Sequence, residues 1–210
     1  MNEYPYLENI IFIWGQTIVP PAVLVGLFLT GKQKGLKIQT IVKFFAAFFI
    51  FVLLKAFLKS WAQYSVWESD ARTKFLLPPH EPTYFYNYVF FRFFLEHTIA
   101  LAAAFIFGGF LFLLYRLSQG AMLMKPEVFL GMFFAFLVGW PAVIILVPAV
   151  FLGMIGWGLS TRALARFYPK IGVKKRLAMT PFLFAAAFAL LFSGDALIRI
   201  FHLTVFKITS

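Results

Sequence analysis

The stretch GMFFAFLVGWPAVIILVPAVFLGMIGWG, residues 131–158, decides how this chain is threaded through a membrane. It is almost wholly apolar, and it is long for one span and short for two, because a span takes about 20 residues. Gly139, Pro141 and Pro148 interrupt it, and a proline inside a helix removes a hydrogen bond and kinks the helix. We therefore predict a broken re-entrant hairpin within residues 128–159, with one long kinked crossing as the alternative.

The composition of the whole chain places this stretch in lipid. Of the 210 residues, 62% are hydrophobic and 13% are charged, and 30 are phenylalanine. A water-soluble chain of this size cannot hide so many phenylalanines in one core, whereas lipid accepts apolar side chains on every face of a helix. The composition predicts an all-α, polytopic integral membrane protein, folded as a single transmembrane domain over residues 1–210.

The chain contains five apolar runs of roughly the length of a membrane span: residues 9–29, 42–61, 89–115, 128–159 and 181–206. The connections 30–43 and 160–178 carry lysines and arginines and no acid, so we expect both on the cytoplasmic side. Both can lie there only if one run doubles back, and the broken run is the candidate. We predict four crossings plus the re-entrant hairpin in the cell (inner) membrane, with both termini outside; five crossings are the alternative.

The remaining long connection, residues 62–88, is then an external loop. It is nearly charge-balanced, and tryptophans and tyrosines flank it, as is typical of the outer headgroup level. Its acids and its histidine could hold a divalent cation, or act as acid and base on a lipid-linked substrate, although exposed loop acids are more often only solvated. These outer-loop candidates are Glu68, Asp70, His80 and Glu81.

Several function classes are excluded or disfavoured. The net charge of +11 comes from bases gathered in short connections, which favours anionic lipid headgroups over nucleic acid as partners. Cysteine is absent, which excludes disulfides, thiolate nucleophiles and cysteine-bound metals. The sequence contains no GxSxG, HExxH or P-loop motif, so it leans away from an enzyme and indicates no cofactor.

Two apolar runs carry unexpected polar groups. Asp195, Arg199 and His202 are spaced i, i+4, i+7, which predicts one polar stripe along a helix. The stripe is either self-paired near the outer end or directed inward as a binding site. In residues 89–115, Arg92 and Glu96 are also four apart, and His97 follows the acid.

These groups allow three uses, of which an interhelical polar network is the least specific. A haem site would use His97 and His202 as ligands. A proton or anion pathway, or an intramembrane enzyme, would use acids and bases from the set Glu96, His97, Asp195 and His202. Phosphate-binding candidates are Lys55, Lys59, Arg92 and Arg199; for the two lysines the ordinary alternative is extension of the side chain to the headgroups.

We weigh three functional hypotheses. The first is a non-catalytic subunit or assembly factor of a larger membrane complex, whose partners are other membrane subunits and lipids. The second is an intramembrane enzyme or carrier acting on a lipid or lipid-linked substrate. The third is a haem-binding electron-transfer anchor, although the sequence gives no clear sign of a metal or cofactor.

Overall fold

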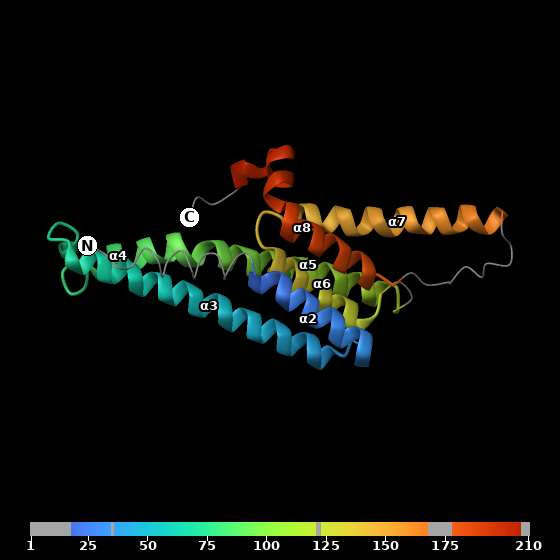
Figure 1. The fold of residues 1–210 in the computed structure, drawn as a ribbon, viewed down its shortest axis with the longest axis horizontal. Coiled ribbons are helices and arrows are strands. Elements are labelled where there is room, and N and C mark those ends of the chain that lie inside the picture. Colours follow the sequence, from blue (N-terminus) through green and yellow to red (C-terminus); the bar gives the residue numbers. More distant parts are fainter. Residues whose placement is uncertain (1–17, 35, 121–122, 168–177, 207–210) are drawn as a thin grey trace.

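The apolar runs form helices. The structure is a computed structural model that describes residues 18–34, 36–120, 123–167 and 178–206. Within these ranges the chain has no β-strand, which confirms the predicted all-α fold (Figure 1). The helices are, in chain order, α2 (Val19–Lys34), α3 (Ile38–Ser69), α4 (Pro82–Val89), α5 (Leu95–Leu117), α6 (Lys125–Val138), α7 (Val143–Phe167) and α8 (Thr180–Ile200). A π-helical turn, η3 (Phe90–Phe94), joins α4 to α5, and the 3₁₀ turns are η2 (Lys74–Leu76) and η4 (Leu203–Phe206).

Several helices are long and apolar enough to cross a membrane. Within the described residues there are four such segments: Ile38–Ser69, Pro82–Leu117, Val143–Thr161 and Thr180–Ile200. The chain is therefore a membrane-embedded bundle of helices. The first predicted run, 9–29, is described only from residue 18, where α2 forms a shorter apolar helix, and residues 9–17 lie outside the described ranges.

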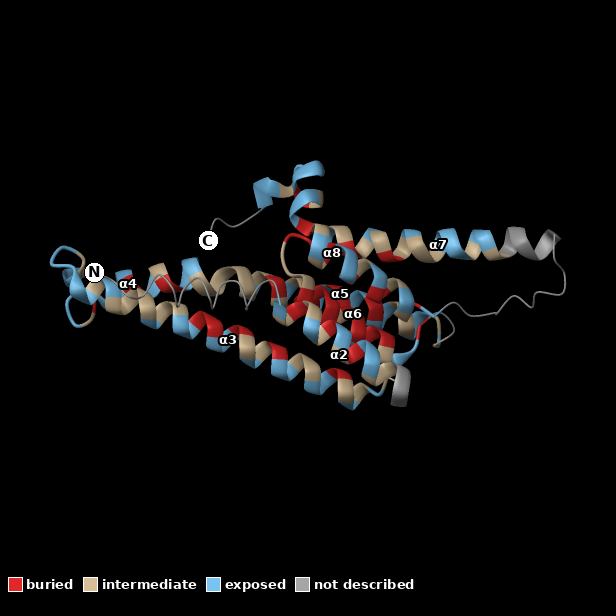
Figure 2. Ribbon diagram, in the orientation of Figure 1, coloured by how far each residue is buried: buried red, intermediate tan, exposed pale blue. Residues whose placement is uncertain are grey.

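Helix α6 forms the centre of the bundle. It packs against α3, α5, α7 and α8, and Figure 2 shows buried residues concentrated around it. Its Phe133 and Phe134 are fully buried. The ring centroid of Phe133 lies 6.0 Å from that of Phe45 on α3, and that of Phe134 lies 4.8 Å from that of Phe184 on α8. A helix that is apolar all round belongs inside a bundle, so the first arm of the predicted hairpin is interior.

Glycines allow α5 and α6 to approach each other closely. A Cβ atom added at Gly108 of α5 would lie 2.9 Å from Cγ of Met132, and one added at Gly131 of α6 would overlap Leu111. Small residues at such contacts let helix backbones come close enough to pack without a hydrophobic driving force. The neighbouring Gly109, in contrast, faces open space.

The predicted break within residues 128–159 is present between α6 and α7. Gly139, the residue after α6, has a φ of 77°, in the left-handed region that glycine adopts without strain. The cis peptide before Pro141 follows, and α7 then runs back along the bundle (Figure 1). The returning arm is itself long enough to cross a membrane. The part of the prediction that makes Pro148 a further break is wrong, because α7 continues through it.

Pro148 is tolerated for two reasons. It lies in the second turn of α7, so its missing N–H costs the helix a single hydrogen bond close to the helix start. Its ring is also exposed and does not displace a packed neighbour. The predicted break is confirmed at Gly139 and Pro141, where α6 ends and α7 has not yet begun.

Glu127 is a buried acid that joins the starts of two helices. It is 3% exposed. Its Oε2 accepts a hydrogen bond from the N–H of Met124, the N-cap of α6, at 2.8 Å. Its Oε1 accepts from the N–H of Met179 at 2.6 Å, and from the N–H and the hydroxyl of Thr180 at 3.2 Å each. Because a carboxylate is favoured at a helix N-terminus, this one side chain holds the beginning of α8 against the beginning of α6.

The connection between α3 and α4 is shorter than the predicted external loop 62–88. Helix α3 continues to Ser69 and α4 begins at Pro82. The aromatic residues explain the extension, because Trp67 packs on Tyr84, Phe85 and Tyr88, with centroid distances of 6.0, 5.6 and 4.9 Å. Helices thus extend through residues that hydropathy alone assigns to a loop. A small second core results, built around Leu77, Phe85 and Val89.

The basic connections are also partly helical. In the predicted loop 30–43, α2 reaches Lys34 and α3 starts at Ile38; in 160–178, α7 reaches Phe167, and residues 168–177 lie outside the described ranges. The α2–α3 connection and the far end of α7 lie at the same end of the bundle, opposite the α3–α4 connection (Figure 1). A shared cytoplasmic side requires this arrangement. That this end of the bundle faces the cytoplasm stays a prediction. Residues 1–17 and 207–210, which include both termini, lie outside the described ranges.

The last predicted run, 181–206, is not one continuous helix. Helix α8 ends at Ile200, and His202 follows with a φ of 54°. The chain then forms η4, whose Phe206 carbonyl accepts a hydrogen bond from the indole N–H of Trp140 at 2.8 Å. The end of the described chain is thereby held to the turn between α6 and α7.

Candidate functional site

The candidate site lies between α3 and the α4–η3–α5 segment, which run antiparallel to each other and pack together at η3 (Figure 1). Two edge-to-face ring pairs fix their register. The centroids of Phe57 and Phe94 are 5.9 Å apart, and those of Tyr64 and Phe85 are 5.6 Å apart. On the bundle-centre side of the Phe57–Phe94 pair, where both segments are α-helical, residues at equal steps from the pair lie at about the same level.

The register brings the charged residues together in two levels. Lys55 and Glu96 each lie two residues beyond the Phe57–Phe94 pair in the direction of the bundle centre. Lys59 and Arg92 each lie two residues beyond it in the opposite direction, toward the α3–α4 connection. We refer to these four residues and His97 as the α3–α5 charge cluster. The structure thus unites two sets of candidates that the sequence presented separately.

The segment η3 contributes Arg92 and shifts the register. Between the two ring pairs the chain advances from Phe85 to Phe94 on one side but only from Phe57 to Tyr64 on the other. The longer side contains the π-helical turn, which accounts for part of this difference. Such turns occur often at functional sites, because they redirect side chains that a regular helix would place elsewhere.

Lys55 is the most unusual member of the cluster. The buried residues of α3 are Ile41, Phe48, Val52, Lys55 and Ala56, so the lysine occupies a position on the apolar stripe of its helix. It is 7% exposed. Its charge is within electrostatic range of Lys59 and Glu96. Extension of Lys55 to the headgroups, the ordinary interpretation from sequence, does not fit this burial; Lys59 is only half-buried.

His97 and Glu96 complete the inner level. Both are half-buried at the start of α5. His97 is within electrostatic range of Lys55 and Lys59. Lys59, Arg92 and Glu96 also each interact with neighbouring groups. Lysines of α3 and polar groups at the start of α5 are thus within electrostatic range of one another.

The cluster carries more positive than negative charge. Over Phe44–Val66 and Pro82–Tyr115 the two helices contribute three cations, Lys55, Lys59 and Arg92, and one acid, Glu96. Charged groups in a membrane interior are costly unless they are paired or face a polar cavity. Within these two ranges the cations therefore outnumber the acids by two.

Comparison with known proteins does not assign this cluster. No family model matches the chain. No curated protein and no solved structure is significantly similar to it either. The function of the cluster has to be inferred from its own geometry and charge.

The polar residues of α8 do not join the cluster. Asp195, Arg199 and His202 are all exposed, and α8 packs on α2, α6 and α7, on the side of the bundle away from α3 (Figures 1 and 2). Nε of Arg199 donates to the carbonyl oxygen of Asp195 at 3.3 Å, within the helix. Because the helix ends at Ile200, His202 does not continue the predicted stripe. The structure does not bring His202 to face His97, as the haem hypothesis requires.

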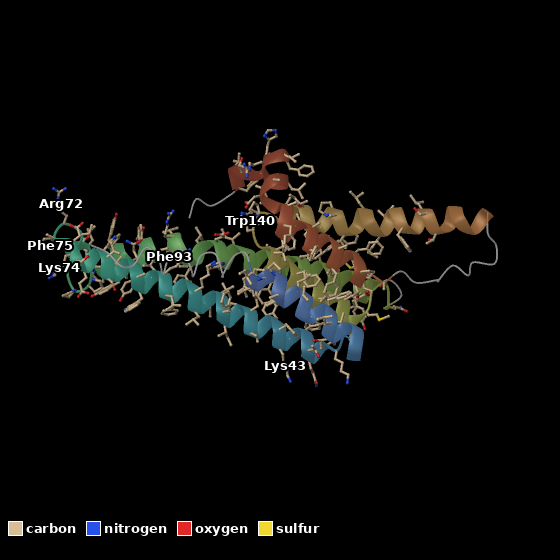
Figure 3. The ribbon with its side chains drawn as sticks, in the orientation of Figure 1. Lys43, Arg72, Lys74, Phe75, Phe93 and Trp140 are labelled. Atoms are coloured by element: carbon tan, nitrogen blue, oxygen red, sulfur yellow. The ribbon has the colours of Figure 1, made fainter. Side chains whose placement is uncertain are left out.

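The outer-loop candidates are spread over the surface of the α3–α4 connection. Glu68, Asp70, His80 and Glu81 are all exposed. Oδ1 of Asp70 accepts a hydrogen bond from the N–H of Arg72 at 3.1 Å, and the ring of His80 lies against Phe75 at 5.7 Å. Among the described residues, no three histidine or acidic side chains are grouped closely enough to hold a metal ion. Figure 3 shows Arg72, Lys74 and Phe75 at the tip formed by the α3–α4 connection.

Glu127 is the important residue that sequence analysis missed. The signal was present, because Lys-Pro-Glu at residues 125–127 places proline in the first turn of α6 and the acid at its third position. That pattern is typical of a helix start at which the acid caps the backbone. The second set of hydrogen bonds, to Met179 and Thr180, could not be foreseen, because it depends on how α8 packs.

Proposed function

We propose that this protein binds an anionic lipid, or a lipid-linked phosphate, at the α3–α5 charge cluster. The observation that supports the proposal most strongly is Lys55, a lysine that is 7% exposed on the apolar stripe of a membrane helix. Lysine and arginine are the usual partners of phosphate groups. Lys59, half-buried beside Lys55, and Arg92, exposed at the level of Lys59, leave the outer side of the cluster open to a headgroup.

The position of the cluster along the helices fits a lipid headgroup. Lys43 and Arg116 lie at the basic end of α3 and α5. At 1.5 Å per residue, Lys55 lies about 18 Å beyond Lys43 along α3. Since the hydrocarbon core is about 30 Å thick, Lys55 then lies in the half of the core away from the basic end. With the predicted sidedness, the lipid belongs to the outer leaflet.

The proposal is one of binding and not of catalysis. Glu96 and His97 have the residue types of an acid and a base. Nothing in their surroundings, however, selects a bond to be broken, and the lysines and arginine are suited to holding a phosphate in place. The lipid-enzyme hypothesis therefore stays a prediction that needs a substrate to test it.

A thermal-stability measurement tests lipid binding. A ligand that binds only the folded state raises the Tm, and saturating phosphatidylglycerol is expected to raise it by about 5–10 °C over phosphatidylcholine. The protein would be unfolded in a neutral detergent with each lipid added. We expect Lys59→Gln to lose most of this increase. The matched control is Lys43→Gln, the same change on the same helix at the opposite end, shown in Figure 3, and it should keep the increase.

Two outcomes of that measurement would contradict the proposal. One is an equal Tm with phosphatidylglycerol and phosphatidylcholine in the wild-type protein. The other is an equal loss of the increase in Lys59→Gln and Lys43→Gln, which would make it an effect of net charge alone.

A second candidate is a subunit or assembly factor of a larger membrane complex, the first of the hypotheses from sequence. The α3–α4 tip favours it, because Phe75, Tyr84 and Tyr86 are exposed there over a small core of their own. Aromatic side chains are enriched in protein interfaces. Purification from native membranes in a mild detergent should then retain other proteins in fixed ratio. A monodisperse protein with no companion would count against this candidate.

A further inference from the structure

Helix α7 is longer than the part of the bundle that it packs against. Glu127, at the start of α6, accepts a hydrogen bond from the N–H of Thr180, at the start of α8. A Cβ atom added at Gly153 of α7 would lie 3.0 Å from Cδ1 of Phe182, in the first turn of α8, so Gly153 lies at the level of these two helix starts. Helix α7 continues to Phe167, which at 1.5 Å per residue is about 21 Å further, and Figure 1 shows it projecting past this end of the bundle. We call residues 155–167 the α7 extension.

Exposed cations mark this end of the bundle as the level of the lipid headgroups. Lys37 precedes α3, Arg116 lies in the last turn of α5 and Lys125 begins α6, and all three are exposed. Such residues gather where helices leave the hydrocarbon core. A bilayer placed around the whole apolar part of α7, Val143–Thr161, would put the level of Gly153 about 12 Å inside its edge, with these charges in hydrocarbon. The α7 extension therefore lies outside the core.

The first part of the α7 extension is apolar, and the rest of the described chain does not cover it. Ile155, Trp157 and Leu159 are 57%, 57% and 62% exposed. Successive residues turn by about 100° around a helix, so Trp157 lies on the side opposite to Ile155 and Leu159. A Cβ atom added at Gly156 would meet no atom within 4 Å. A helix that is apolar on all sides is buried in lipid or in protein, and at this level, beyond the core, protein is the covering that fits.

We infer that the α7 extension is the docking surface for a second protein, which encloses it in an apolar groove edged with acidic side chains. The charges of the segment decide the kind of partner, because residues 155–178 contain six lysines and arginines and no acid. A second copy of this chain would bring like charges together here, whereas acidic groups of a different protein would be attracted. The inference goes beyond the proposed lipid site and does not depend on it, since it involves no residue of the α3–α5 charge cluster.

Cysteine accessibility tests this inference, because the chain has no native cysteine. Leu159→Cys would be treated with a membrane-impermeant maleimide in native membranes and in vesicles reconstituted with the purified full chain, both opened so that the reagent reaches each face. We expect rapid alkylation in vesicles of phosphatidylcholine, with or without phosphatidylglycerol. In native membranes we expect alkylation about tenfold slower, because a site that is open for about a tenth of the time reacts at about a tenth of its free rate.

Two further single-cysteine variants calibrate these rates. Lys125→Cys, at an exposed helix start at the same end of the bundle, should react rapidly in both settings. Ile106→Cys, in the middle of α5 and 74% exposed, faces lipid and should react slowly in both. Adding Arg162→Glu and Arg166→Glu to Leu159→Cys should restore rapid alkylation in native membranes, because the attraction to an acidic partner becomes repulsion.

Each other outcome overturns the inference in its own way. Slow alkylation of Leu159→Cys in both kinds of vesicle would mean that lipid covers the α7 extension. Slow alkylation only in the vesicles with phosphatidylglycerol would mean that it lies on an anionic leaflet. Equally rapid alkylation in vesicles and in native membranes would mean that no partner encloses it. Protection in native membranes that survives the two arginine replacements would exclude an acidic partner.

Discussion

Replacing Glu127 with alanine is expected to destabilise the protein by about 3–5 kcal/mol, because each buried donor left without its acceptor costs about 1–3 kcal/mol. Four hydrogen bonds end on this carboxylate, from the N–H groups of Met124, Met179 and Thr180 and from the hydroxyl of Thr180. Alanine leaves these donors without their acceptor, at a site that is shielded from water. The starts of α6 and α8 would lose their common anchor.

Denaturation of the purified protein in mixed micelles, with increasing SDS and circular dichroism as the readout, measures this effect. Glu127→Gln keeps one acceptor oxygen but turns an NH₂ group toward backbone donors, so an intermediate loss is expected. The matched control is Glu68→Gln, because Glu68 is an exposed acid on the outer tip, and a change below about 0.5 kcal/mol is expected there. Equal stability of Glu127→Ala and the wild type would show that the anchor is not needed.

Enlarging Gly131 is expected to have the second-largest effect. A Cβ atom at Gly131 would overlap Leu111, which is fully buried in the contact between α5 and α6 and has little room to turn aside. Gly131→Val should therefore cost about 1–3 kcal/mol through overpacking, although valine has the better helix propensity. The same SDS denaturation measures it.

Two neighbouring glycines of α5 provide the control. Gly108 faces Met132 and Gly109 faces open space. We expect Gly108→Val to destabilise the protein, and Gly109→Val to be neutral or slightly stabilising, since it adds helix propensity without a clash. Equal effects at the two positions would mean that α5 and α6 are not packed as closely as described.

The helical fold was predictable because two strong signals agree. Long apolar runs report burial in lipid, and Gly139 with Pro141 reports a break that a helix cannot absorb. The helix ends were not predictable to the same degree. Residues 62–69 are polar and aromatic, so hydropathy ends the span at Trp61, whereas the packing of Trp67 on α4 continues the helix to Ser69.

The candidate site was predictable only in parts. Spacing alone placed Lys55 with Lys59 and Arg92 with Glu96, because residues four apart share a helix face. Whether the two faces meet depends on the rotation and register of α3 against α5. That register is set by ring contacts and by the π-helical turn η3, neither of which leaves a distinct pattern in the sequence.

The same limit explains the outcome for α8. The spacing of Asp195 and Arg199 does place them on one face of a helix, and the structure joins them through a hydrogen bond. The sequence cannot tell whether that face points into the bundle, because the residues of α8 that are buried, such as Leu183 and Ala187, are no more apolar than many others in the helix. Packing on α6 and α7 buries those residues and leaves Asp195 exposed.

The most direct test of the central claim is the lipid content of the protein purified from its own membranes. Wild-type protein, the double variant Lys59→Gln/Arg92→Gln and the control Lys43→Gln would be extracted in a mild neutral detergent, and the retained lipids quantified by mass spectrometry. We predict that a phosphate-containing anionic lipid stays with the wild type and the control in about a one-to-one ratio, as one charge cluster per chain requires, and is lost from the double variant. The same lipid in the same amount on all three proteins would contradict lipid binding at the α3–α5 charge cluster.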